Sequence, residues 1–201
     1  MSSWLISVPV WGASYVRTFV DCAAPALVVA VRRLGGPVKF LIHTSSPDQI
    51  RAALPGQVVE CRPVGNKPTY VALQESHAEA VAAAAPGDRV VLLNADLVVS
   101  GNLLTRCAEH FALGELAVVL NGIRTQEDLR VRPPIGAEPR VLMAWAWAHR
   151  HQIIRDLEYP RGQSLLPTNL FFAAGDSVVA RCFHMHPVAI VKQESTSFRS
   201  T

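Results

Sequence analysis

Short apolar runs alternate with longer segments of helical character along the first half of the chain. The runs are rich in β-branched residues, as strands are, and lie at residues 4–10, 38–43, 57–62 and 90–93. Helices are predicted between them, at residues 15–34, 47–53 and 68–85. This alternation is typical of a parallel sheet covered on both faces. It predicts a single-domain α/β/α sandwich with a mostly parallel central sheet over residues 1–192, followed by a polar tail at 193–201.

The second half of the chain continues the pattern less regularly. A helix is predicted at residues 102–111, a strand at 116–121, and a polar loop with several arginines and prolines at 122–139. Residues 138–157 have the composition of one long helix, in which Trp145 and Trp147 are expected to pack, since large aromatics are mostly buried. Residues 170–173 and 177–182 surround Gly175 and Asp176, which predicts a hairpin.

The run Val90–Leu93 has no polar alternation, which indicates a central strand buried on both faces. Asn94 and Asp96 follow it at a spacing of two, so in an extended chain both side chains leave the same face. Open α/β sheets bind their ligands at this carboxyl end, and a carboxylate there suits a divalent cation. The alternative is that both residues terminate the strand and cap the next element, as Asn and Asp commonly do.

A buried strand, an Asp-x-Asp-like pair and a small polar turn into a helix together resemble the metal and nucleotide-sugar motif of GT-A fold glycosyltransferases. The order of elements and the later segment Phe183–Pro187 are also similar to that superfamily, in particular to bacterial proteins described as nucleotide-diphospho-sugar transferase-like. One position departs from the motif, because Asn94 stands where the family has an acid. Asp96 is then the only carboxylate of the pair, which weakens a metal site.

The resemblance implies a set of binding residues at two strand ends. Aromatic side chains after the first strand would stack on the nucleotide base, and the residues after the buried strand would hold its diphosphate through Mn²⁺ or Mg²⁺. The nucleotide-sugar site would comprise Trp11, Gly12, Tyr15, Asn94, Ala95 and Asp96. The metal ligands would be Asp96, His186 and His184. For the aromatics the alternative is that they pack in the core or anchor the following helix, and for the histidines it is a structural role.

Composition removes several other classes of protein. No Gly-x-Gly-x-x-Gly follows the first strand and no Gly-Lys-Ser/Thr loop occurs, which excludes dinucleotide oxidoreductases and P-loop NTPases. The basic residues behind the net charge of +3 are dispersed, so no nucleic-acid partner is predicted, and the four cysteines lack metal-site spacing. The most apolar stretch, residues 22–31, is too short to span a bilayer. We expect a cytoplasmic protein, and peripheral association with the inner membrane face stays open.

Three functional hypotheses are consistent with these residues. The first is a glycosyltransferase of the hexosyltransferase type, which transfers a sugar from a nucleoside-diphosphate sugar to a hydroxyl acceptor with a metal ion. No carboxylate is marked by its spacing as the catalytic base. The second is a catalytically inactive GT-A-like scaffold that binds a nucleotide or a partner, which Asn94 favours. The third is a nucleotidyltransferase. It ranks last, because this chain lacks the glycine-rich basic loop that such an enzyme would carry after the first strand.

Overall fold

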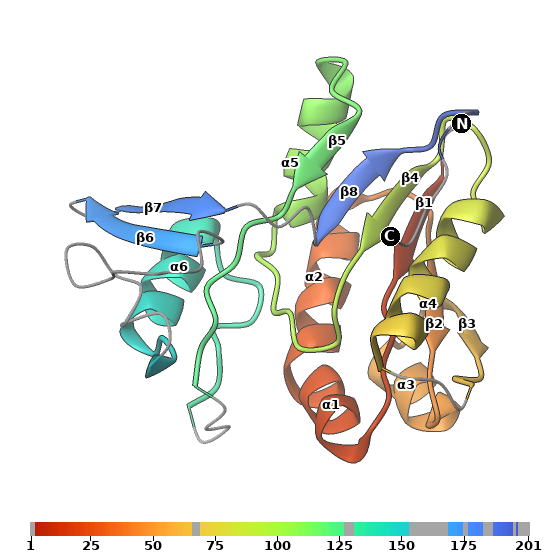
Figure 1. Cartoon of the computed structure of the whole chain (residues 1–201), viewed down its shortest axis with the longest axis horizontal. Helices are drawn as coiled ribbons and strands as arrows, with labels where there is room; N and C mark the ends of the chain where they lie inside the picture. Colours follow the sequence, from red (N-terminus) through yellow and green to blue (C-terminus); the bar gives the residue numbers. More distant parts are fainter. Residues whose placement is uncertain are drawn as a thin grey trace.

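A six-stranded sheet in the order β3-β2-β1-β4-β8-β5 lies at the centre of the molecule (Figure 1). The computed structural model describes residues 3–65, 69–126, 131–152, 169–174, 177–182, 187–194 and 196. Four strands run parallel: β1 (Trp4–Ser7), β2 (Val38–His43), β3 (Val58–Arg62) and β4 (Arg89–Leu92). Strand β8 (Val188–Val191) is antiparallel to both β4 and β5 (Ala117–Val119). The predicted α/β sandwich with a mostly parallel sheet is confirmed.

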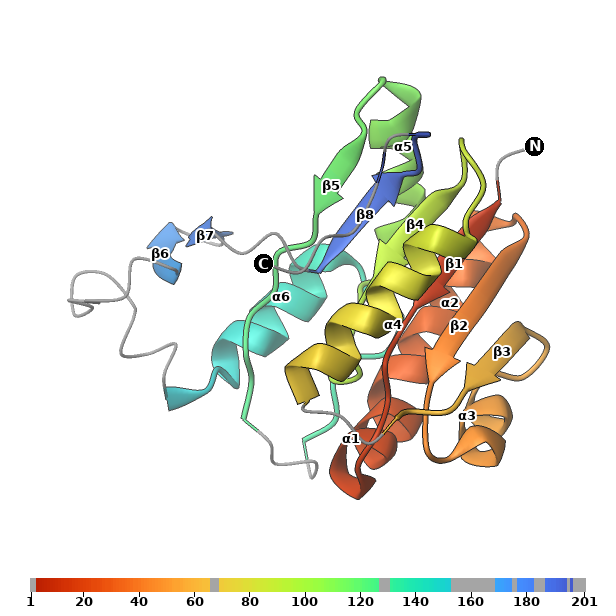
Figure 2. The same ribbon diagram turned by 45° about the vertical axis from the view of Figure 1, so that its right-hand side comes forward.

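Helices cover the two faces of this sheet unequally, as Figure 2 shows. One face carries a continuous helical segment made of α1 (Ala13–Thr18), the π-helix η1 (Phe19–Ala23) and α2 (Ala24–Leu34), and α5 (Leu103–Ala112) packs beside α2. The other face carries α4 (Thr69–Ala83), while the short α3 (Pro47–Ala53) lies near β3. We call these the α2 face and the α4 face.

The alternation of side chains along each strand divides the core between the two faces. On the α2 face, Ile6, Phe40, Ile42 and Val91 belong to one large cluster of buried apolar residues that also contains most of α2. On the α4 face the cluster is small and contains Leu5, Leu41, Ala80, Val81, Ala84, Val90 and Leu92. Strand β4 lies inside the sheet and contributes to both clusters, as its unbroken apolar sequence predicted.

The helix predicted at residues 15–34 contains a π-helix immediately before α2, whose first turn contains Pro25. Proline has no N–H to donate, and the five residues before α2 adopt the wider turn, in which Ala24 N–H donates to Phe19 O. The helical segment Ala13–Leu34 has 22 residues and a mean hydropathy of 1.4 in its most apolar window, of which 56% is buried. By length and composition alone it could cross a membrane. A core helix passes the same test, and this one packs on the sheet.

In the second half of the chain, the sequence predicted one pair of strands and missed another strand. Strand β8 was missed, although its sequence Val-Ala-Ile-Val after Pro187 is β-branched and could have indicated it. The hairpin β6 (Asn169–Ala174) and β7 (Ser177–Cys182) is confirmed as an antiparallel pair, and it forms a separate two-stranded sheet.

The long helix predicted at 138–157 is wrong in its extent, because α6 runs only over Pro139–Ala148. Backbone pairing ends it. Gln126 N–H donates to His149 O at 3.0 Å, and His151 N–H donates to Arg124 O at 2.9 Å. A helix continuing past Ala148 would lose these bonds to the segment before it.

Candidate functional site

The two strand ends that the sequence singled out lie side by side. Strands β1 and β4 are parallel neighbours in which Ser7 is opposite Leu92, and the pairing continues as Leu93 N–H donates to Ser7 O at 3.0 Å. Both strands therefore end at the same edge of the sheet. Trp11 and Gly12 follow the first, and Asn94 to Asp96 follow the second.

The loop after β1 turns sharply into α1. Val10 N–H donates to His43 O at 2.8 Å, which extends the pairing with β2 beyond β1 itself. Gly12 then adopts a φ of +83°, a conformation that side chains rarely tolerate, and begins α1. Tyr15 is 51% exposed and Trp11 is half-buried. For Tyr15 the alternative of core packing is therefore wrong.

The loop after β4 presents its three residues to different surroundings. Ala95 is buried in the α2-face core, Asn94 is half-buried, and its carbonyl accepts a hydrogen bond from Leu97 N–H at 3.3 Å. Asp96 is exposed, and within the described residues its carboxylate makes no hydrogen bond or ion pair. The N-cap of α5 is Asn102. Asp96 therefore does not cap the helix that comes after it.

The side-chain oxygens at this edge suit a hard divalent cation, although they offer few ligands. Asp96 offers a carboxylate and Asn94 an amide oxygen, and Mg²⁺ is commonly held by one or two carboxylates together with substrate phosphates. Among the residues that the structure describes, no three His, Cys, Asp or Glu side chains gather as a metal site. His184 and His186 lie outside the described residues, so their predicted ligation stays a prediction.

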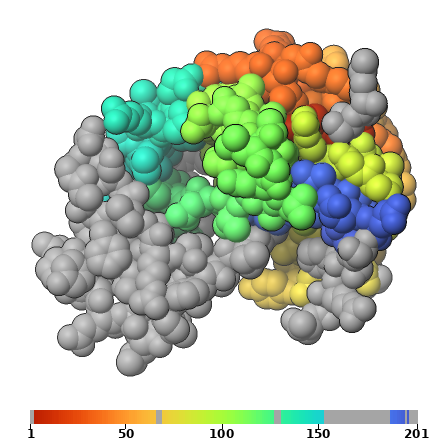
Figure 3. Space-filling model, turned by 90° about the horizontal axis from the view of Figure 1, so that it is seen from above, coloured from red at the N-terminus to blue at the C-terminus, as the bar shows by residue number. Residues whose placement is uncertain are grey.

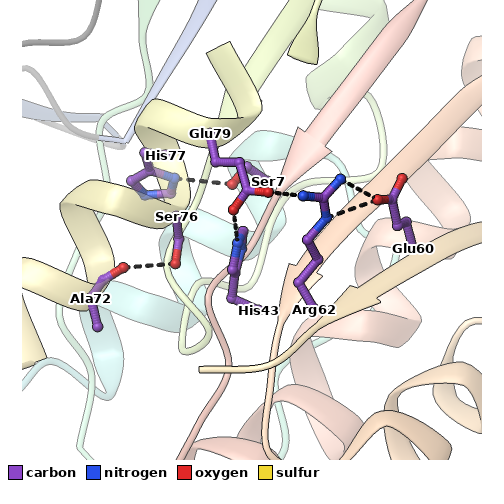
Figure 4. A network of polar contacts seen from close by, with 8 residues as sticks. All are labelled: Ser7, His43, Glu60, Arg62, Ala72, Ser76, His77 and Glu79. Carbon is purple, nitrogen blue, oxygen red and sulfur yellow. Dashed lines mark hydrogen bonds and ion pairs between the residues drawn. The ribbon is translucent and has the colours of Figure 1, made fainter. Parts of the chain in front are cut away.

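A polar network that the sequence analysis missed joins α4 to the sheet (Figure 4). His43, the last residue of β2, lies with Nε2 2.7 Å from Glu79 Oε2, and Glu79 also pairs with Arg62 at the end of β3. Arg62 Nε donates to Glu60 at 2.8 Å, and Lys39 pairs with the same carboxylate at 2.5 Å. Hydrogen bonds from Lys39 and then Arg62 hold the pKa of Glu60 below its usual value.

A cavity of about 150 Å³ lies beside this network, at the same edge of the sheet. It is lined by His43, Pro63, Val64, Gly65, Ala72, Glu75, Ser76 and Glu79. The His43 side chain is 7% exposed, and its Nδ1 has no hydrogen-bond partner. The position of His43 and Arg62 at two neighbouring strand ends was the signal that could have shown this cluster, by the same reasoning that led to Asn94 and Asp96.

A second buried pair anchors the middle of α4. Ser7 Oγ lies 3.1 Å from His77 Nδ1, and both residues are almost fully buried. Ser7 ends β1, so this hydrogen bond joins α4 to the strand that leads into the Trp11 loop. The carboxyl edge is thus built from apolar packing on one face and polar contacts on the other.

Comparison with known proteins adds a fold likeness. No family model matches the chain, and no curated protein matches it. A solved structure of 4-diphosphocytidyl-2C-methyl-D-erythritol synthase is similar over 62% of this chain and 63% of that chain, at 16% sequence identity and a TM-score of 0.39. The resemblance to GT-A fold enzymes stays a prediction.

Proposed function

We propose that the chain is a glycosyltransferase that binds a nucleoside-diphosphate sugar at the carboxyl edge of its sheet and transfers the sugar to a hydroxyl acceptor. The observation that supports the proposal is that β1 and β4, which lead into the Trp11–Gly12 and Asn94–Asp96 loops, are parallel neighbours that end at the same edge of the sheet. Ligands of open α/β sheets bind outside the carboxyl ends of such strands.

Each residue has a role that suits its surroundings. The exposed ring of Tyr15 and the half-buried Trp11 would stack on the base, as aromatic faces do in nucleotide sites. The exposed Asp96 carboxylate and the Asn94 amide would hold a divalent cation. When bound, Mn²⁺ or Mg²⁺ neutralises charge on the departing diphosphate. Gly12, whose φ is +83°, lets the backbone turn beside the nucleotide without a side chain.

The transfer has a simple balance. The acceptor oxygen forms a bond to the anomeric carbon, the bond from that carbon to the diphosphate oxygen breaks, and the acceptor proton passes to a base. The described residues mark no carboxylate for this last role.

A second candidate is a binding scaffold without turnover, and Asn94 is the observation that favours it. A metal site with one carboxylate holds its cation less tightly than one with two, so nucleotide binding can persist where catalysis does not. The two candidates differ in whether sugar transfer accompanies binding.

Calorimetry with Mn²⁺ and a panel of nucleoside diphosphates tests the site. We expect Asp96→Ala to weaken metal-dependent nucleotide binding by tenfold or more while leaving the melting temperature unchanged, because an exposed carboxylate contributes little to packing. Asn94→Asp should strengthen Mn²⁺-dependent binding by adding a second negative charge. Asp48→Ala, on the solvent-exposed side of α3, is the matched control. Binding that is unchanged in Asp96→Ala would contradict the metal site.

Sugar release and transfer then separate the two candidates. Incubation of the protein with nucleotide sugars and Mn²⁺, followed by detection of free nucleoside diphosphate, reports transfer to acceptor or to water. Release that Asp96→Ala abolishes supports the transferase. Binding without release in every donor tested supports the scaffold.

A further inference from the structure

Helix α6 has an apolar sequence that its place in the fold does not explain. Eight of its ten residues, in the sequence Pro-Arg-Val-Leu-Met-Ala-Trp-Ala-Trp-Ala, are apolar, and they surround the helix axis on every side. A helix that is hydrophobic all round is normally buried in a core or in a membrane. No residue of α6 is buried. The burial of α6 in the fold therefore does not account for its apolar sequence.

The segment around α6 shares this character. We define the α6 arm as residues 131–152. Val131, Ile135 and Val141 are 43%, 39% and 55% exposed, and the two tryptophans of α6 are half-buried. Figure 3 shows the arm in teal at one side of the molecule, next to the green residues of α5.

The arm is fixed to the body at one end through its single carboxylate. Glu138 pairs with Arg33 of α2 and accepts a hydrogen bond from Asn102 Nδ2 at 3.1 Å. Gly101 N–H donates to Ala137 O at 3.0 Å, and a Cβ at Gly101 would lie 2.5 Å from Gly136 O. The attachment is close and polar, so the apolar part of the arm is left outside it.

The remaining charges of the arm are all basic. Arg132 and Arg140 are exposed, and the Arg150 guanidinium lies 4.3 Å from the centre of the Trp147 ring. Because Glu138 is already paired with Arg33, the arm presents arginine charge together with apolar and indole surface. Anionic lipid headgroups attract such charge, and tryptophan is enriched where headgroups meet acyl chains.

We propose that the α6 arm docks on an anionic membrane surface. Val131, Ile135 and Val141 enter the boundary between headgroups and acyl chains, the tryptophans lie at its level, and Arg132 and Arg140 contact lipid phosphates. The combination of apolar side chains with the exposed charges of Arg132 and Arg140 favours a lipid surface over a protein groove. This binding is independent of the proposed nucleotide site.

Flotation of the full chain with vesicles tests the proposal. The protein should float with vesicles of phosphatidylcholine and phosphatidylglycerol, float much less with phosphatidylcholine alone, and detach as salt is raised, since salt screens the attraction. Absence of association with anionic vesicles at low salt overturns the proposal.

Paired variants locate the contact. Val141→Glu should lower vesicle affinity roughly tenfold, because it puts a charge in place of an apolar contact. Val58→Glu, at a valine 64% exposed on β3, should leave it unchanged. Arg140→Gln should lower affinity about fivefold, the expected effect of one basic charge near the surface, while Arg106→Gln on α5 should not. Equal losses in arm variants and controls overturn the assignment to the arm.

Two further measurements separate a lipid surface from a second copy of the chain, and the arm from the nucleotide site. Sedimentation velocity of the wild type without lipid detects a dimer. If the protein does not bind vesicles, and if it forms a dimer that Val141→Glu dissociates, then a second copy covers the arm and the lipid proposal is overturned. Asp96→Ala should float like the wild type, and Val141→Glu should bind nucleotide like the wild type. Failure at one site therefore leaves the other interpretable.

Discussion

The two faces of the central sheet are stabilised by different interactions, apolar packing on the α2 face and largely polar contacts on the α4 face. On the α2 face, large apolar side chains such as Phe19, Phe40 and Leu27 fill one continuous core. On the α4 face, the helix presents Ala72, Ser76, His77, Ala80 and Val81, and much of its attachment is polar. Dispersion and hydrophobic burial depend on volume and tolerate many arrangements, whereas hydrogen bonds fix direction. The α4 face is therefore the more specific and the less strongly held of the two.

The difference bears on where function can reside. A helix held by Ser7–His77 and by the pairs of Glu79 with His43 and Arg62 keeps polar groups beside the carboxyl edge of the sheet. A face filled with phenylalanine and leucine cannot present such groups. The cavity beside α4 lies on the polar side for this reason.

The largest expected effect comes from the α2 face. Phe40 is fully buried in the middle of β2, so Phe40→Ala should lower the free energy of unfolding by about 3–5 kcal/mol through lost burial and a new cavity. Urea unfolding followed by circular dichroism measures it. Phe40→Leu, which keeps most of the volume, should cost far less. Similar losses for the two variants would contradict a core governed by volume.

A smaller effect is expected on the α4 face from Ser7→Ala, which removes the hydrogen bond to a buried histidine. We expect a loss of about 1–3 kcal/mol, the cost of removing one partner of a buried polar pair. Ser76→Ala is the matched control, because its hydroxyl donates only to Ala72 O one turn back in the same helix. If both variants lose the same stability in chemical unfolding, the Ser7–His77 contact does not anchor α4.

The smallest effect concerns Asp88, before β4. Burial raises the pKa of Asp88, but hydrogen bonds from Ser3 N–H, Ser3 Oγ and Ala85 N–H outweigh it and hold the pKa below the ordinary value of 3.8. A carboxyl whose folded pKa is lowered contributes stability that is present above the unfolded pKa and is lost as pH falls through the folded pKa.

Asp88→Asn should therefore be less stable than the wild type at neutral pH, and the difference should shrink as pH falls below about 4. Thermal melts across this range measure the difference. A constant gap between the two proteins at every pH would show that the charge of Asp88 contributes nothing to stability.

The sequence predicted the parallel half of the fold because its strands are short apolar runs and its helices are bounded by Pro and Gly. Strand β2 was placed with its observed bounds, and β4 was placed in the interior. The β-branched sequence of β8 could have indicated a strand, but its antiparallel position between β4 and β5 depends on long-range pairing and could not be predicted. The early end of α6 likewise depends on pairing with residues 124–126.

At the candidate site, the sequence could indicate that Asn94 and Asp96 follow a buried strand, and the fold shows that this strand is the neighbour of β1, which leads into the Trp11 loop. For the cluster of His43, Arg62 and Glu79, the sequence could indicate the strand-end positions of His43 and Arg62, but it could not indicate their pairing with Glu79. The members of this cluster come from three elements, and no local pattern records which face of α4 turns toward the sheet. Pairwise contacts between distant residues appear only when the topology is known.

The π-helix before Pro25 sets the rotational phase of everything that precedes it. It has five residues, and each residue in a helix contributes about 100° of rotation and 1.5 Å of rise. Deleting one residue between Phe19 and Ala23 would let an ordinary α-helix form while α2 stayed packed on the sheet. Helix α1 would then turn by about 100°, carrying Tyr15 and the Trp11 loop away from the end of β4. The extra residue of the π-helix thus determines the direction in which α1 presents Tyr15 and the Trp11 loop.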